Sequence, residues 1–107
     1  MNDLNNHKAL TLVNEDSNDT QTINKLFASD LLSHVIGYAE EHDVLITVLN
    51  NINVLGVASL LDLSAVIFTH NAKIKPDIIT RANDLNLSLF ITPLSTADII
   101  KQLASLE

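Results

Sequence analysis

Apolar positions along the chain fall into short blocks of strand length. Residues 44–49 (VLITVL) and 65–68 (AVIF) are continuous apolar runs, a pattern typical of strands covered on both faces. Residues 87–92 (LSLFIT) predict a third such strand. Closer to the N-terminus, residues 9–13 and 22–28 predict two further strands. The chain therefore supplies enough strands for one sheet.

Helical periodicity fills the intervals between these strands. Ser29 and Asp30 are good N-caps for a first helix. Residues 40–43 are polar and are expected to close this helix on its solvent side. The predicted buried stripe of the helix recurs at three- and four-residue spacing: Leu31, Leu32, Val35, Ile36 and Ala39.

Three more helices are expected further along. Residues 54–61 predict one, and Pro76 begins another because proline suits the first turn of a helix. Pro93 and Ser95 lead into the last helix. The residues expected to face inward are Ile78, Ile79, Ala82 and Leu85 in the helix after Pro76, and Ala97, Ile100, Leu103 and Ala104 in the last one.

The alternation of helix and strand with short links predicts the fold class. Helix–strand repeats of this kind form parallel strands with right-handed crossovers. We expect a single three-layer α/β/α domain with a mainly parallel sheet, spanning residues 1–107. Residues 1–8 are expected to be disordered, and residues 14–21 form an acidic, turn-rich loop.

Composition narrows the classes of protein and partner. The chain has three Phe, one Tyr and no Trp, so its core must be aliphatic. It has no Cys, which fits a cytoplasmic protein, and neither a signal peptide nor a membrane span is expected. Six basic against thirteen acidic residues give a net charge of −7, which disfavours nucleic acid as a partner. A single nucleotide is still compatible with that charge.

The two glycines predict no phosphate-binding loop. Gly37 and Gly56 both fall inside predicted helices, where glycine costs about 1 kcal/mol relative to alanine. A Walker loop or a dinucleotide fingerprint instead needs glycines between a strand and a helix. We interpret both glycines as sites of close helix packing, on a strand or on a second subunit.

One pair of side chains has the spacing of a catalytic dyad. Asp30 and His34 lie four residues apart, so on one helix a carboxylate and an imidazole could pair. No nucleophile can be assigned beside them, so a capping Asp near a surface His is the favoured interpretation. The other histidines, His7, His42 and His70, share no metal-ligand spacing with His34, and no metal site is predicted.

Two clusters of polar residues remain to be interpreted. Glu40, Glu41 and Asp43 are interpreted as a solvated helix end. More informative are the polar residues at the carboxyl ends of the parallel strands, where open α/β sheets bind ligands. They are Asn50, Asn51 and Asn53, then Thr69, His70 and Asn71, then Thr92, Ser95 and Thr96.

With these residues in view, the stretch 27–107 resembles the DRTGG domain family. The matching segments are FASDLLSHV (27–35), LITV (45–48), NVLGVASLLDL (53–63) and AVIF (65–68). The chain departs from the family pattern at four positions. Lys25 and Leu26 replace a Gly-Gly pair, His34 replaces an acidic residue, and Gly56 replaces an alanine.

The resemblance implies a non-catalytic regulatory or protein-interaction domain that acts as a homodimer, without a cofactor. Similar domains occur at the N-terminus of bacterial HPr kinase/phosphorylase, in CBS-containing pyrophosphatases and in long phosphotransacetylases. It also implies a possible protein partner in carbon or energy metabolism. The positions that it marks for ligand contact are Ser29, Asp30, Ser33, Thr47 and Asn53. Two alternatives stay open: a sensor of adenine nucleotide or another anionic metabolite, and a small enzyme using Asp30 and His34.

Overall fold

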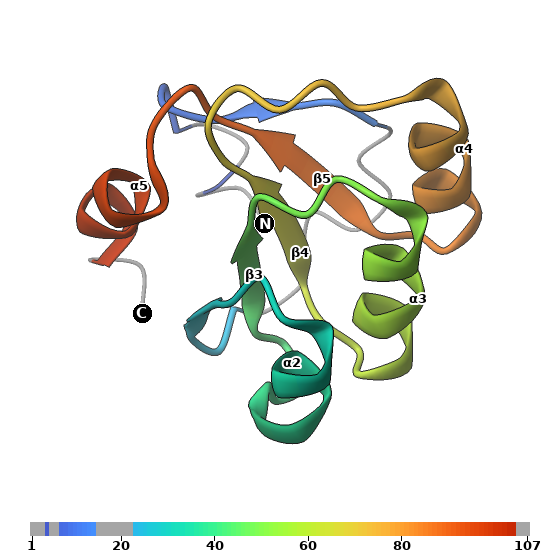
Figure 1. Cartoon of the computed structure of the whole chain (residues 1–107). Coiled ribbons are helices and arrows are strands. Elements are labelled where there is room, and N and C mark those ends of the chain that lie inside the picture. Colours follow the sequence, from blue (N-terminus) through green and yellow to red (C-terminus); the bar gives the residue numbers. More distant parts are fainter. Residues whose placement is uncertain (1–3, 5–6, 15–22, 105–107) are drawn as a thin grey trace.

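The computed structural model of the chain describes residues 4, 7–14 and 23–104, and it forms a five-stranded, mainly parallel sheet (Figure 1). The strand order is β1-β5-β4-β3-β2. Neighbouring strands from β2 to β5 pair in parallel, and β1 pairs antiparallel with β5. The predicted fold class is confirmed. The strands are β1 (Thr11–Leu12), β2 (Leu26–Ala28), β3 (Val44–Thr47), β4 (Ala65–Phe68) and β5 (Ser88–Ile91).

Helices cover both faces of the sheet, but unequally. The helices are α2 (Leu32–Tyr38), α3 (Ile52–Leu60), α4 (Pro76–Asp84) and α5 (Thr96–Leu103). The chain steps from β2 to β5 in one direction, so right-handed crossovers place α2, α3 and α4 on the same face (Figure 1). Helix α5 covers the opposite face. None of the helices in the described ranges has the length and apolar character that a membrane crossing requires.

The sheet separates two apolar cores, which are mostly aliphatic but also bury Phe68 and Phe90. Under α2 to α4, Val35, Leu55 and Ala82 pack against strand residues such as Leu45 and Phe68. On the other face, Ile99 and Leu103 of α5 pack against residues that include Ile46 and Ile67. Strands β3 and β4 are buried at every position because both of their faces are covered.

Helices α3 and α4 end in the same way. After α3, the Leu63 amide donates to the Ala58 carbonyl (3.0 Å), and Asp62 adopts a left-handed φ of 55°. After α4, the Leu87 amide donates to the Ala82 carbonyl (2.9 Å), and Asn86 has a φ of 56°. Both are Schellman motifs in which Asp and Asn occupy the position that glycine usually takes.

The predicted stripe of the first helix is partly wrong. Val35 is buried, but Leu31 is 62% and Ile36 is 50% exposed. The helix begins only at Leu32, with Leu31 as its N-cap, and it covers a sheet edge with a single fully buried residue. The last helix is also rotated relative to the prediction: Ile99 and Leu103 are buried, whereas Ala97 and Ala104 are exposed.

Of the N-terminal residues that the structure describes, Leu4 is fully buried in the α5-side core. Residues 1–3 and 5–6 lie outside the described residues, and the disorder expected for residues 1–8 stays a prediction. Beyond β1, the Asn14 side chain bonds to the carbonyl of Leu87 (2.7 Å) and accepts from the Leu89 amide (2.8 Å). Asn14 thereby fastens the antiparallel strand to the start of β5.

The two glycines do not serve close packing within the chain. Both lie in helices as predicted, Gly37 in α2 and Gly56 in α3. A Cβ atom added at either position would meet no atom within 4 Å. Packing of these glycines on a strand is therefore wrong, and packing on a second subunit stays a prediction.

Candidate functional site at the carboxyl edge of the sheet

Three threonines line the edge of the sheet at which the parallel strands end. Thr47 is the last residue of β3, and Thr69 and Thr92 directly follow β4 and β5. All three are buried. The Thr69 amide donates to the Thr47 carbonyl (3.1 Å), and the Thr92 amide donates to the Phe68 carbonyl (3.0 Å), so the strand pairing extends to the threonines.

Each of these hydroxyl groups has a partner within the protein. Thr47 Oγ1 donates to Asp30 Oδ1 (2.8 Å) and accepts from the Leu49 amide (3.1 Å). The hydroxyls of Thr69 and Thr96 are 3.2 Å apart. Thr92 Oγ1 accepts from the Leu94 amide (3.2 Å). These side chains hold the strand ends to the segments that follow them.

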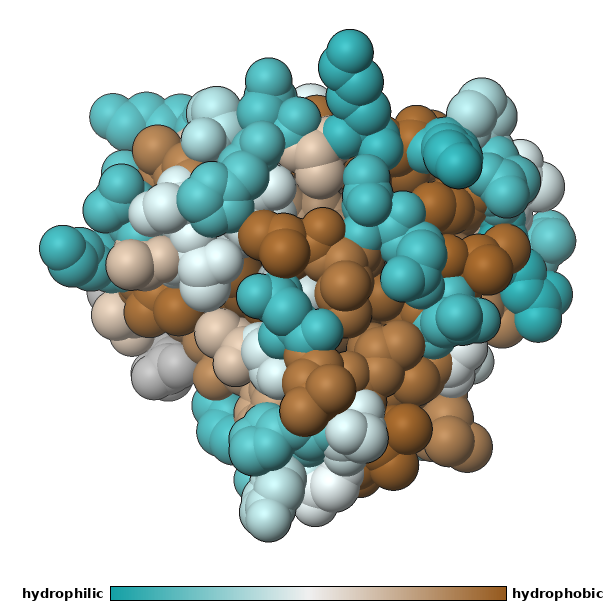
Figure 2. Space-filling model, in the orientation of Figure 1, coloured by the Kyte–Doolittle hydropathy of each residue, from teal (hydrophilic) through white to brown (hydrophobic). Residues whose placement is uncertain are grey.

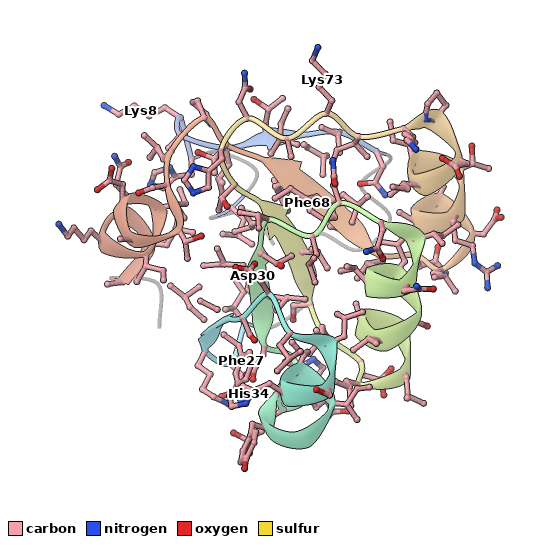
Figure 3. All side chains as sticks on the ribbon, viewed as in Figure 1. Lys8, Phe27, Asp30, His34, Phe68 and Lys73 are labelled. Atoms are coloured by element: carbon pink, nitrogen blue, oxygen red, sulfur yellow. The ribbon has the colours of Figure 1, made fainter. Side chains whose placement is uncertain are left out.

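Asp30 is not an N-cap, contrary to the prediction. Its Oδ1 accepts from Thr47 and also from the Val48 amide (2.8 Å), so the carboxylate joins the end of β2 to the end of β3 (Figure 3). Ser29 Oγ accepts from the Leu31 amide (3.2 Å) within the same turn. The sequence-predicted residues Asp30 and Thr47 are thus brought into direct contact.

Asp30 and His34 do not form the dyad that their spacing suggested. Asp30 precedes α2, so the four-residue spacing does not place the two side chains on one helix face. The His34 ring instead lies between Phe27 and Tyr38, with centroid distances of 6.0 and 4.6 Å (Figure 3). Within the described residues, no group of three His, Asp or Glu side chains is arranged to hold a metal ion.

Asn53 and Ser33, the remaining predicted contacts, are both exposed. Asn51, not Asn53, caps α3, and its side chain accepts from the Asn53 amide (3.0 Å). Asn50 Nδ2 donates to the Lys73 carbonyl (2.9 Å) and joins the loops that follow β3 and β4. A ligand role for Ser29, Asp30, Ser33, Thr47 and Asn53 stays a prediction.

At the opposite edge of the sheet, Asp43 forms a buried polar cluster. It was expected to be solvated, but it is fully buried. Its oxygens accept from Asn24 Nδ2 (3.1 Å), Lys25 Nζ (2.9 Å) and the Glu40 amide (2.8 Å). Hydrogen bonds to Asp43 and Glu40 raise the pKa of Lys25 above its ordinary value of 10.5. Asp43 is buried because Asn24 and Lys25, in the segment that precedes β2, contact it, and helical periodicity cannot reveal such distant partners.

The structure contains an exposed apolar surface that the sequence analysis did not predict. Six large apolar side chains on α2, α3 and the adjoining loops are exposed, and Figure 2 shows apolar side chains gathered on this face of the molecule. We call these residues the α2–α3 surface: Leu31, Ile36, Tyr38, Val48, Ile52 and Leu60. The sequence feature that could have indicated this surface is the segment 52–60, which contains no Asp, Glu, Lys or Arg.

One family model matches nearly all of the chain. The model of the DRTGG domain family matches residues 4–106. The structure is similar, with a TM-score of 0.73, to the CBS and DRTGG domains of the regulatory region of Clostridium perfringens pyrophosphatase, crystallised with the activator diadenosine tetraphosphate. The identity is 16%, and the match covers 86% of this chain and 40% of that one. No curated protein sequence matches the chain significantly.

Proposed function

The chain belongs to the DRTGG domain family, and we propose that it is a regulatory domain without catalytic activity that works by association, as a homodimer. The observation that carries this proposal is the α2–α3 surface. Large exposed apolar patches on proteins mark sites of protein interaction. Six exposed large apolar side chains among the residues that the structure describes are better explained by a protein partner than by solvent.

The polar residues at the carboxyl edge of the sheet support the same function. The hydroxyls of Thr47, Thr69 and Thr92 are engaged in hydrogen bonds that close the fold. Asp30 is engaged by Thr47 and Val48, and His34 by aromatic rings. Reactive carboxylates and imidazoles need access to a substrate and to each other. These side chains are committed to structure, which disfavours the enzyme using Asp30 and His34.

The test is the mass of the full chain in solution. Sedimentation equilibrium over a concentration series should give a mass that approaches twice that of the monomer. A monomer across the whole series would overturn the homodimer. A dimer with a measurable dissociation constant would support it and provide the reference value for variants.

A second candidate is the sensing of an adenine nucleotide. Its support is the crystal structure of the similar pyrophosphatase region, which contains an adenine dinucleotide activator. The positions proposed for contact are Ser29, Asp30, Ser33, Thr47 and Asn53. Ser33 and Asn53 lie in the first turns of α2 and α3, and the amide groups at a helix N-terminus favour anions. The net charge of −7 opposes a long polyphosphate, so the amide groups would have to outweigh it.

A thermal-shift series distinguishes the two candidates. AMP, ATP and diadenosine tetraphosphate are added in turn, with inorganic phosphate as the control for a general anion effect. A ligand at about 100 times its Kd stabilises by about 2.7 kcal/mol, which raises the Tm of a domain this size by many degrees. A rise with a nucleotide and not with phosphate supports sensing. A flat profile supports association alone, with a cytoplasmic protein of carbon or energy metabolism as the proposed further partner.

A further inference from the structure

We infer that two copies of this chain pack helix α3 against helix α3, with Gly56 of each copy at the point where the helices cross. This inference rests on the proposed homodimer and adds the location and geometry of its interface. Its first support is the outer face of α3, which is uncharged. The exposed residues of the helix are Ile52, Asn53, Gly56, Ser59 and Leu60.

The other long helices provide an internal comparison. Helix α4 exposes Asp77, Arg81 and Asp84, and helix α5 exposes Asp98 and Lys101. Such charged outer faces are the normal state of helices that face water. A helix that is apolar or neutral all round is normally buried on both sides. Helix α3 is apolar or neutral all round although one side of it is exposed. Its exposed side is therefore suited to packing against another protein.

Gly56 gives this face a notch between two projecting side chains. Ile52, Gly56 and Leu60 recur every four residues and form one stripe along the helix. Ile52 is 45% and Leu60 is 73% exposed, while a Cβ atom at Gly56 would meet nothing within 4 Å. Side-chain size at the contact sets the distance between packed helices. A glycine at the centre of the stripe therefore allows a second helix to approach closely.

The occupant that fits is a second copy. A two-fold interface brings the same patch of both subunits together, so it must be self-complementary. Two chains that each carry a net charge of −7 repel elsewhere, but the outer face of α3 brings no charge to the contact. Its stripe is also self-complementary in shape, since Ile52 or Leu60 of one copy can lie over Gly56 of the other. The α2–α3 surface also includes the exposed Ile36 and Tyr38 of the neighbouring helix α2.

The decisive variant is Gly56→Ala, because it should stabilise the monomer and weaken the dimer. Alanine is the better helix former and has free space in the single chain, so the Tm of the monomer should rise by about 4 °C. In the dimer the added methyl groups fill the notch, and overpacking should raise the dissociation constant about tenfold. If Gly56 lies outside the dimer contact, Gly56→Ala would raise the Tm and leave the dissociation constant unchanged, which would overturn the inference.

A second variant places a charge on the same face. Leu60→Glu should raise the dissociation constant about a hundredfold, because two carboxylates would be buried in one apolar contact. The matched control is Thr80→Glu at an exposed position of α4, which should leave the dissociation constant unchanged. Circular dichroism of each variant establishes that it is folded.

The outcomes separate the inference from the proposed function. If the unmodified chain is a monomer, both the homodimer and this interface are wrong. If the unmodified chain is a dimer and both Gly56→Ala and Leu60→Glu leave its dissociation constant unchanged, the homodimer holds and the α3 crossing is overturned. Weakening by both variants but not by Thr80→Glu supports the crossing.

Discussion

The carboxylate of Asp30 accepts a 2.8 Å hydrogen bond from the hydroxyl of Thr47, and so ties the segment leaving β2 to the last residue of β3. Replacing Asp30 with Ala or Thr47 with Val should each lower the free energy of unfolding by about 1–2 kcal/mol, because a charge-assisted bond is lost. A double-mutant cycle in urea should give a coupling of about 1 kcal/mol. Ser33→Ala, at an exposed position, is the control and should change stability by less than about 0.5 kcal/mol.

Asp43 should be among the least replaceable polar residues of the chain. In Asp43→Asn an amide group would face the donors Asn24, Lys25 and the Glu40 amide, and the free energy of unfolding should fall by about 2–4 kcal/mol. Glu41 lies two residues from Asp43, and its side chain is exposed. Glu41→Gln removes its negative charge and should have little effect on the free energy of unfolding. Equal stabilities of the two variants in urea would contradict the role assigned to the cluster.

Lys25 should make the protein sensitive to alkaline pH. Its pKa is raised in the folded state by its hydrogen bonds to Asp43 and Glu40, so folding favours the charged form. That stabilisation is fully present below the unfolded pKa of 10.5 and is lost as the pH rises through the higher folded value. Urea unfolding above the unfolded pKa of 10.5 should show an additional decline in the free energy of unfolding that Lys25→Met abolishes. Parallel declines in the two proteins would contradict this assignment.

A glycine in place of Asp62 should stabilise the C-terminal end of α3. Asp62 occupies the left-handed position of a Schellman motif, where a side chain costs about 1 kcal/mol or more. Asp62→Gly should therefore raise the free energy of unfolding by about 1 kcal/mol, and Asn86→Gly at the end of α4 by less, because Asn tolerates this conformation. Asp84→Gly, at the last helical residue of α4, is the matched control and should be destabilising. The midpoint of urea unfolding measures all three.

The parts of the fold that local chemistry determines could be predicted from the sequence. The bounds of β4 were predicted correctly because a continuous apolar run is what burial on both faces requires. The start of α4 followed from Pro76, whose fixed φ and missing N–H suit a first turn. The three-layer arrangement followed from the alternation of these elements.

The rest depended on partners distant along the chain. Asp43 has the sequence context of a solvated helix end, yet Asn24 and Lys25 on the neighbouring segment bury it. Asp30 has the context of an N-cap, yet the end of β3 offers it stronger donors. Leu31 and Ile36 follow a core periodicity although they are exposed, because an apolar interaction surface and a core have the same pattern of residues.

The pairing of β1 with β5 has a consequence for the order of assembly. Thr11 is aligned with Ile91, so among the described strands the first along the chain pairs with the last. Each of the other neighbours is separated by one crossover helix, and such nearby partners can join while synthesis continues. Strand β1 can pair only after β5 has been synthesised, so this is the strand pairing with the most distant partners along the sequence.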